Sequence, residues 1–154
     1  MPAEDGVDRL VARLYLEITM RGAVQSPVAH RHRVLLVDDY DDTREVLATV
    51  IRRAGCDVET AWGGEDALRH FREGTLPCVV LLDLRMASVD GWAVWERMRA
   101  DKRLAHVPVV IISGDVAQRA HARAAGVREF LTKPVEAEQL LAAIGAYCND
   151  QPHS

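Results

Sequence analysis

Four apolar runs of this chain are each followed at once by a charged or hydroxyl side chain. The runs and the groups that end them are 34–37 with Asp38 and Asp39, 78–82 with Asp83, 109–112 with Ser113, and 130–132 with Lys133. Apolar runs of this length, bounded by polar residues, indicate strands that are buried on both faces of a parallel sheet. The carboxyl ends of parallel strands lie at one edge, where open α/β sheets build their sites. We therefore expect the three aspartates, the serine and the lysine to lie close together.

From residue 33 onward, apolar runs alternate with amphipathic stretches, which is typical of repeated βα units around a parallel sheet. The strands expected from this pattern are 33–37, 57–60, 78–82, 107–112 and 128–131, and the helices are 43–54, 64–73, 92–101, 116–125 and 137–147. Gly55 and Gly126 follow the first and fourth helices, where a glycine that tolerates positive φ often ends a helix. Charged residues alternate with Val58 and Thr60 in the second strand, so we expect it at an edge of the sheet.

Residues 5–20 precede this pattern and carry apolar side chains at helical spacing, which predicts an amphipathic helix. An exposed apolar stripe is costly, since burying each such side chain is worth about 1.5 to 3 kcal/mol. We expect two copies of the chain to bury this stripe by pairing their helices in a homodimer. Alternatively, the stripe packs against the rest of the chain or against a partner protein. A further alternative is that translation starts at Met20, so that the helix is not made.

The length of 154 residues favours a single globular domain. The expected organisation is an N-terminal helix and linker over 1–32, the α/β domain over 33–150, and a tail over 151–154. A formal net charge of -4 argues against a surface built for direct nucleic-acid binding. No apolar stretch approaches the roughly 20 residues needed to span a bilayer, so we expect no membrane insertion. Three scattered cysteines indicate reduced thiols and a cytoplasmic location; they are Cys56, Cys78 and Cys148.

The grouped acids suggest a chemistry. Three aspartates within a few ångströms repel one another, so the group requires a cation, and hard oxygen ligands favour Mg²⁺. A single aspartate at a strand end is more often a helix cap or a turn residue. Asp41, Asp42 and Thr43 fit that simpler explanation, because they directly precede a helical pattern. The recurrence of polar groups at four strand ends does not, and together with a lysine and a hydroxyl it suits the holding of a phosphoryl group.

With these residues in this order, residues 33–148 resemble the receiver domain of two-component response regulators. The motifs are VLLVDDYDDTREVL, VVLLDLRMASVDGWAVWERMR, VPVVIISG and FLTKPV, and they span about three quarters of the chain. The resemblance implies an α/β fold with a doubly wound, five-stranded parallel sheet of flavodoxin-like order 2-1-3-4-5. The extra N-terminal helix would lie outside that fold.

The resemblance also implies roles for single residues. Asp83 would accept a phosphoryl group, while Asp38, Asp39, Asp83 and the backbone carbonyl of Arg85 would hold Mg²⁺. Lys133 would contact the phosphoryl oxygens and Ser113 would donate a hydrogen bond to them. Such phosphoryl transfer relies on positioning and charge neutralisation.

Three further features follow from the same resemblance. Ser113 and Phe130 would form the conformational switch, although plain core packing explains Phe130 equally well. The peptide bond between Lys133 and Pro134 would be cis, as only about 5 to 6% of X-Pro bonds are in general. Two residues depart from the common pattern: Ala87 stands where many receivers have proline, and Gly114 where alanine is frequent.

As a receiver, the chain would be a stand-alone signalling protein rather than an enzyme, assisting only its own phosphotransfer and dephosphorylation. Its expected partners are a sensor histidine kinase or phosphotransfer protein and a downstream protein, which the sequence does not name. One alternative is a Mg²⁺-dependent phosphohydrolase with an Asp nucleophile, as in haloacid-dehalogenase-like enzymes. Those place an acid two residues after the nucleophile, where this chain has Arg85. Another is a flavin-binding module, but an acidic first loop would repel the flavin phosphate.

Overall fold

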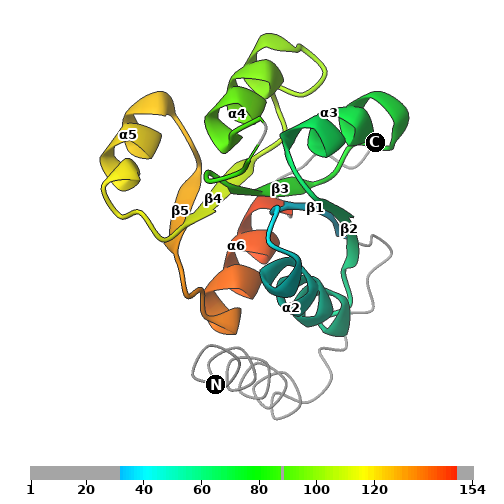
Figure 1. Ribbon diagram of the computed structural model, residues 1–154. Helices are drawn as coiled ribbons and strands as arrows, with labels where there is room; N and C mark the ends of the chain where they lie inside the picture. The colour runs from blue at the N-terminus through cyan, green and yellow to red at the C-terminus, as the bar shows by residue number, and fades with distance from the viewer. Residues whose placement is uncertain (1–31, 88, 149–154) are drawn as a thin grey trace.

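The computed structural model describes residues 32–87 and 89–148 of the chain. Strands and helices alternate throughout this part of the chain (Figure 1). The strands are β1 (Arg33–Val37), β2 (Asp57–Ala61), β3 (Val79–Asp83), β4 (Val109–Ser113) and β5 (Glu129–Thr132). The helices are α2 (Asp41–Arg53), α3 (Gly64–Glu73), α4 (Gly91–Ala100), α5 (Gln118–Ala125) and α6 (Ala137–Cys148). The expected N-terminal helix, linker and tail lie outside the described residues.

The strands form one parallel sheet with the order β2-β1-β3-β4-β5, which confirms the expected doubly wound arrangement. Helices α2 and α6 cover one face of this sheet, and α3, α4 and α5 cover the other (Figure 1). Strand β2 lies at an edge, as its alternating charged residues predicted. Gly55 and Gly126 have φ angles of 94° and 91°, so each takes the left-handed conformation expected after a helix.

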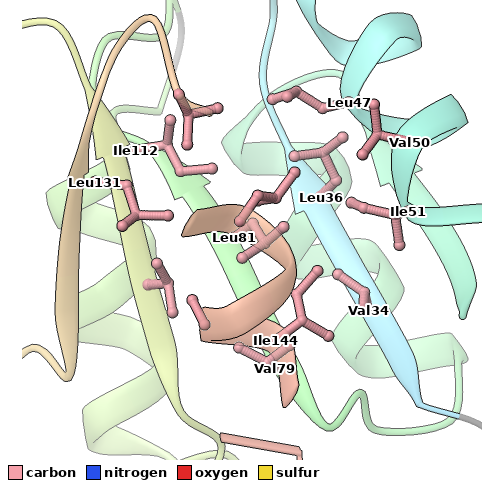
Figure 2. Packing of buried hydrophobic residues seen from close by; sticks show 14 of the residues in the cluster. Val34, Leu36, Leu47, Val50, Ile51, Val79, Leu81, Ile112, Leu131 and Ile144 are labelled. Atoms are coloured by element: carbon pink, nitrogen blue, oxygen red, sulfur yellow. The ribbon is translucent and has the colours of Figure 1, made fainter. Parts of the chain in front are cut away.

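Two apolar layers hold the helices on the sheet, because successive strand side chains point to opposite faces. In the first layer, Leu36 and Leu81 pack with Ile51 of α2 and Ile144 of α6 (Figure 2). The second layer places the neighbouring strand residues against α3, α4 and α5. The central strands are buried along their whole length, including their polar end residues Asp83 and Ser113.

Several element boundaries differ from the expected ones. Strand β3 runs through Asp83 and β4 through Ser113, one residue beyond the apolar runs. The cause is the ladder, in which Asp83 pairs with Ile112 and Ser113 pairs with Thr132. Helix α5 begins at Gln118, two residues later than predicted. A turn precedes it, in which Oδ1 of Asp115 accepts a hydrogen bond from the N–H of Ala117 at 3.1 Å. No helix in the described part of the chain is long and apolar enough to cross a membrane.

Candidate functional site

The carboxyl ends of β1 and β3 bring three aspartates together. Asp38 and Asp39 follow β1, Asp83 ends β3, and one carboxylate oxygen of each lies within 4.8 Å of the others. Asp38 and Asp83 are 2% and 7% exposed, whereas Asp39 is open to solvent. A buried pair of acids beside an exposed one leaves a side from which a cation and a ligand can enter.

Lys133, one residue past β5, is the cation that faces these acids. Its Nζ lies 3.2 Å from Oδ2 of Asp38 and 3.5 Å from Oδ2 of Asp83. Among the described residues, Lys102 is the other lysine and lies exposed on the surface. The ammonium therefore offsets part of the negative charge and bridges the ends of three different strands.

Backbone N–H groups fix the orientation of each carboxylate. Tyr40 donates to Oδ1 of Asp38 at 2.9 Å, and Ala87 donates to Oδ2 of Asp39 at 2.9 Å. The N–H of Arg85 donates to Oδ1 of Asp83 at 3.2 Å. In Asp38 and Asp83 the other oxygen faces the ammonium of Lys133. Three converging carboxylates are suited to a hard divalent cation such as Mg²⁺, so the donor set fits the expected metal.

The pKa of Asp83 is raised to about 6. Burial is the main cause, the neighbouring Asp38 adds to the shift, and Lys133 and the Arg85 N–H oppose it. An acid whose folded-state pKa exceeds its unfolded-state pKa stabilises the fold while it is protonated. This contribution is complete below about pH 4 and is lost as the pH rises through 6.

We accordingly expect Asp83→Asn to stabilise the metal-free protein at pH 8 and to leave its stability nearly unchanged at pH 4. The amide carries no charge to bury, so the variant avoids the loss that wild type suffers as Asp83 ionises. The raised pKa of Asp83 sets an upper limit of about 3 kcal/mol on this gain in the free energy of unfolding, and solvent screening reduces the gain to about 1 to 2 kcal/mol. Urea unfolding in a chelator, followed by tryptophan fluorescence, measures the difference; an equal gain at both pH values contradicts this electrostatic cause.

Ser113 and the neighbouring β5 complete the edge. Ser113 is 1% exposed, and its Oγ accepts a hydrogen bond from the N–H of Asp115 at 3.1 Å. The N–H of Lys133 donates to the carbonyl of Ser113 at 3.0 Å, and the peptide bond that follows Lys133 is cis to Pro134. Strand β4 and the turn after β5 are therefore held together beside the acids.

Phe130 is half-buried on β5 and packs at the margin of the second apolar layer. The guanidinium of Arg119 from α5 lies 5.3 Å from the centre of its ring, and the same side chain donates to Oγ1 of Thr132 at 2.6 Å. The sequence did not single out Arg119. Its contacts depend on how α5 packs beside β5, and no local motif predicts that.

The side chain of Arg85 is 83% exposed and lies 3.9 Å from Asp115. This contact was also missed from the sequence, because Asp115 reads locally as a residue that starts a helix. Arg85 follows β3 and Asp115 follows β4, so this contact joins the loops after two neighbouring strands. The Arg85 guanidinium is thus an exposed charge at the rim of the site rather than one of its buried groups.

The family model described as the response regulator receiver domain matches residues 34–145. The chain belongs to this family. Among curated relatives, Protein PilG of Pseudomonas aeruginosa is 32% identical over 117 residues, which cover 75% of this chain and 86% of PilG. The probable transcriptional regulator ycf27 of Guillardia theta is 36% identical over 118 residues, covering 75% of this chain but 45% of that protein. The receiver thus spans less than half of that relative and most of PilG.

Solved structures show the same fold. A response regulator receiver protein from Pseudomonas putida is 32% identical, with a TM-score of 0.71 and coverage of 77% of this chain and 99% of that one. TrrA from Thermotoga maritima, solved in complex with Mg²⁺-BeF, is 25% identical, with a TM-score of 0.68 and coverage of 75% and 98%. Both the sequence and the fold therefore support the assignment of this chain as a receiver domain of two-component signalling.

Proposed function

We propose that this receiver accepts a phosphoryl group on Asp83 in the presence of Mg²⁺ and thereby switches a surface that binds another protein. The observation that carries the proposal is the arrangement of Asp83, Lys133 and two further acids at one sheet edge. Lys133 contacts both Asp38 and Asp83, at 3.2 and 3.5 Å. A cation that already bridges two carboxylates is placed to contact the oxygens of a phosphoryl group bound to one of them.

The expected donor is a phosphohistidine of a sensor histidine kinase or phosphotransfer protein. An oxygen of Asp83 attacks the phosphorus, the P–N bond breaks, and the imidazole leaves with its electron pair and takes a proton from water. The product is an aspartyl phosphate. Ionised Asp83 is the nucleophile, and because its pKa lies near 6 it is largely ionised at neutral pH.

Mg²⁺, held by Asp38, Asp39, Asp83 and the backbone carbonyl of Arg85, would neutralise charge on the transferring group. The solved complex of TrrA with Mg²⁺-BeF supports this part of the proposal. In this chain the three carboxylates already converge within 4.8 Å. Backbone N–H groups orient each of these carboxylates.

The proposed switch begins at Ser113, because its hydroxyl lies at the end of β4 beside Asp83. The phosphoryl group of an aspartyl phosphate carries about 1.5 to 2 negative charges and three acceptor oxygens. Ser113 would donate to one of them and give up its present contact with the Asp115 N–H. Phe130 and Arg119, which stack on each other, would then rearrange on the face formed by α5, β5 and α6.

A downstream protein would bind that face, and its identity stays open. Stand-alone action, homodimer formation through the N-terminal helix and a cytoplasmic location stay predictions as well.

The phosphohydrolase alternative requires an acid two residues after the nucleophile. Arg85 occupies that position with an exposed guanidinium in place of a carboxyl group. The structure therefore offers no acid for that chemistry at this position.

Labelling of Asp83 tests the proposal. The wild-type chain and Asp83→Asn are incubated with Mg²⁺ and acetyl phosphate, and the intact masses are compared. We expect the mass of one phosphoryl group on wild type and none on Asp83→Asn, with loss of labelling in a chelator. Glu96→Gln, which changes an exposed acid in the middle of α4, is the matched control and should label like wild type. Equal labelling of wild type and Asp83→Asn contradicts the assignment.

A further inference from the structure

A second group of ligating side chains lies at the amino edge of the sheet, away from the aspartates. His32, Cys78 and Cys148 each place one ligand atom there, and these atoms lie within 4.8 Å of one another. His32 precedes β1, Cys78 precedes β3, and Cys148 ends α6. The receiver chemistry uses none of these residues, so their convergence needs its own explanation.

The backbone holds the three residues in place. The carbonyl of His32 accepts a hydrogen bond from the N–H of Asp57 at 2.9 Å, and the N–H of Cys78 donates to the carbonyl of Arg33 at 2.7 Å. Cys148 lies one helical turn after Ile144, which Figure 2 shows beside Val79. The register of the sheet and the docking of α6 therefore fix the spacing of this group.

Cys56 is a third thiol on this side of the sheet, although its sulfur is not among the atoms that lie within 4.8 Å of one another. It directly precedes β2, and it packs with Cys78 and Cys148 against the same apolar layer on the α2 and α6 face. Burial raises the pKa of Cys148, and the neighbouring Cys78 and Cys56 raise it further. All three thiols are free of disulfides.

We propose that His32, Cys78 and Cys148, with Cys56 as the fourth ligand, form a structural Zn²⁺ site. Sulfur and imidazole nitrogen are the ligands that zinc selects, and Cys3His is a common set for closed structural sites. With Zn–S bonds of about 2.3 Å, two sulfurs in a tetrahedral site lie about 3.8 Å apart. The limit of 4.8 Å observed for His32, Cys78 and Cys148 is within reach of that spacing by small side-chain rotations. Cys56 lies outside that limit and would have to turn toward the other three on binding.

The surroundings suit a structural site rather than a catalytic one. Cys148 is fully buried, and Nδ1 of His32 is buried as well. A closed site has no open position for a substrate. Zinc there would tie the beginnings of β1, β2 and β3 to the end of α6, and because it binds only the folded chain it would raise the thermal midpoint.

The site is tested on the full reduced chain with Co²⁺ as a spectroscopic substitute for Zn²⁺. We expect one equivalent of Co²⁺ to produce thiolate-to-cobalt charge-transfer bands and tetrahedral visible bands, and Zn²⁺ to displace it. Cys148→Ala and Cys78→Ala should each lower the Zn²⁺ affinity more than about 10-fold, because losing a ligand costs at least as much as losing one of its supporting partners. His106→Ala removes an exposed imidazole from the loop before β4, outside the ligand group, and should bind like wild type.

Two measurements keep the test decisive. Asp83→Asn should leave the thiolate bands unchanged, which separates this site from the phosphoryl site and its proposed function. X-ray absorption at the zinc edge counts the sulfur neighbours in wild type, so the result does not depend on whether a cysteine variant folds. Cobalt held without sulfur, no binding by the reduced protein, or a Cys78 to Cys148 disulfide that forms even with Zn²⁺ present would each overturn the proposal.

Discussion

Lys133→Met should destabilise the metal-free protein by about 2 to 4 kcal/mol at pH 8, because removing one partner of a largely buried ion pair leaves the other charge uncompensated. Nζ of Lys133 is the cation that contacts both Asp38 and Asp83. Methionine keeps most of the apolar stem, so the effect measures the charge more than the packing. The partial exposure of Lys133 sets the expected loss slightly below that of a fully buried pair.

The pH dependence of this loss has a definite sign. Lys133 lowers the pKa of Asp83 against the effect of burial, so its removal raises that pKa further. At pH 5 Asp83 is then protonated in the folded state and needs no cation. We expect the loss to shrink at pH 5 and to be largest at pH 8, in urea unfolding with a chelator present.

Two variants serve as controls. Lys102→Met removes the exposed lysine and should change stability by no more than about 0.5 kcal/mol. Combining Lys133→Met with Asp83→Asn should recover part of the loss, with a coupling of about 1 to 3 kcal/mol. Additive effects of the two substitutions would show that Lys133 does not act through Asp83.

The convergence of the site residues is the part that sequence reasoning reaches best. Once residues 34–37, 78–82 and 109–112 are recognised as parallel buried strands, the polar groups that follow them must share one edge. Asp83 and Ser113 proved to be the last residues of their strands rather than the first of their loops. The difference arises because strands pair through backbone hydrogen bonds, which a polar residue forms just as an apolar residue does.

The contacts missed from the sequence are those that depend on packing between distant elements. Arg119 meets Phe130 and Thr132 because α5 lies beside β5, and Arg85 meets Asp115 across the rim of the site. The cysteines offer a clearer case. Their spacing along the chain matches no metal motif, yet the sheet register brings the beginnings of neighbouring strands together. Cys148 joins them only because α6 extends to that residue.

Gly91→Ala should destabilise the protein by about 2 to 3 kcal/mol and slow phosphorylation of Asp83 more than about 10-fold. A Cβ at Gly91 would lie 2.3 Å from the carbonyl oxygen of Asp83 and 2.7 Å from Cα of Leu84. Both are backbone atoms, so no side-chain rotation relieves the overlap. The N–H of Gly91 also donates to the carbonyl of Leu84 at 3.1 Å, which fixes the start of α4 on this loop.

The expected result is specific because the overlap can be relieved only by moving the backbone that carries the phosphoacceptor. Gly114→Ala is the matched control: it also lies beside the site, next to Ser113, but a Cβ there meets nothing within 4 Å. It should change stability by no more than about 0.5 kcal/mol and label like wild type. Urea midpoints and the rate of labelling by acetyl phosphate test the pair. Equal midpoints and equal rates for the two variants would show that the loop after β3 moves freely enough to accept a side chain, and that the close approach of α4 does not position Asp83.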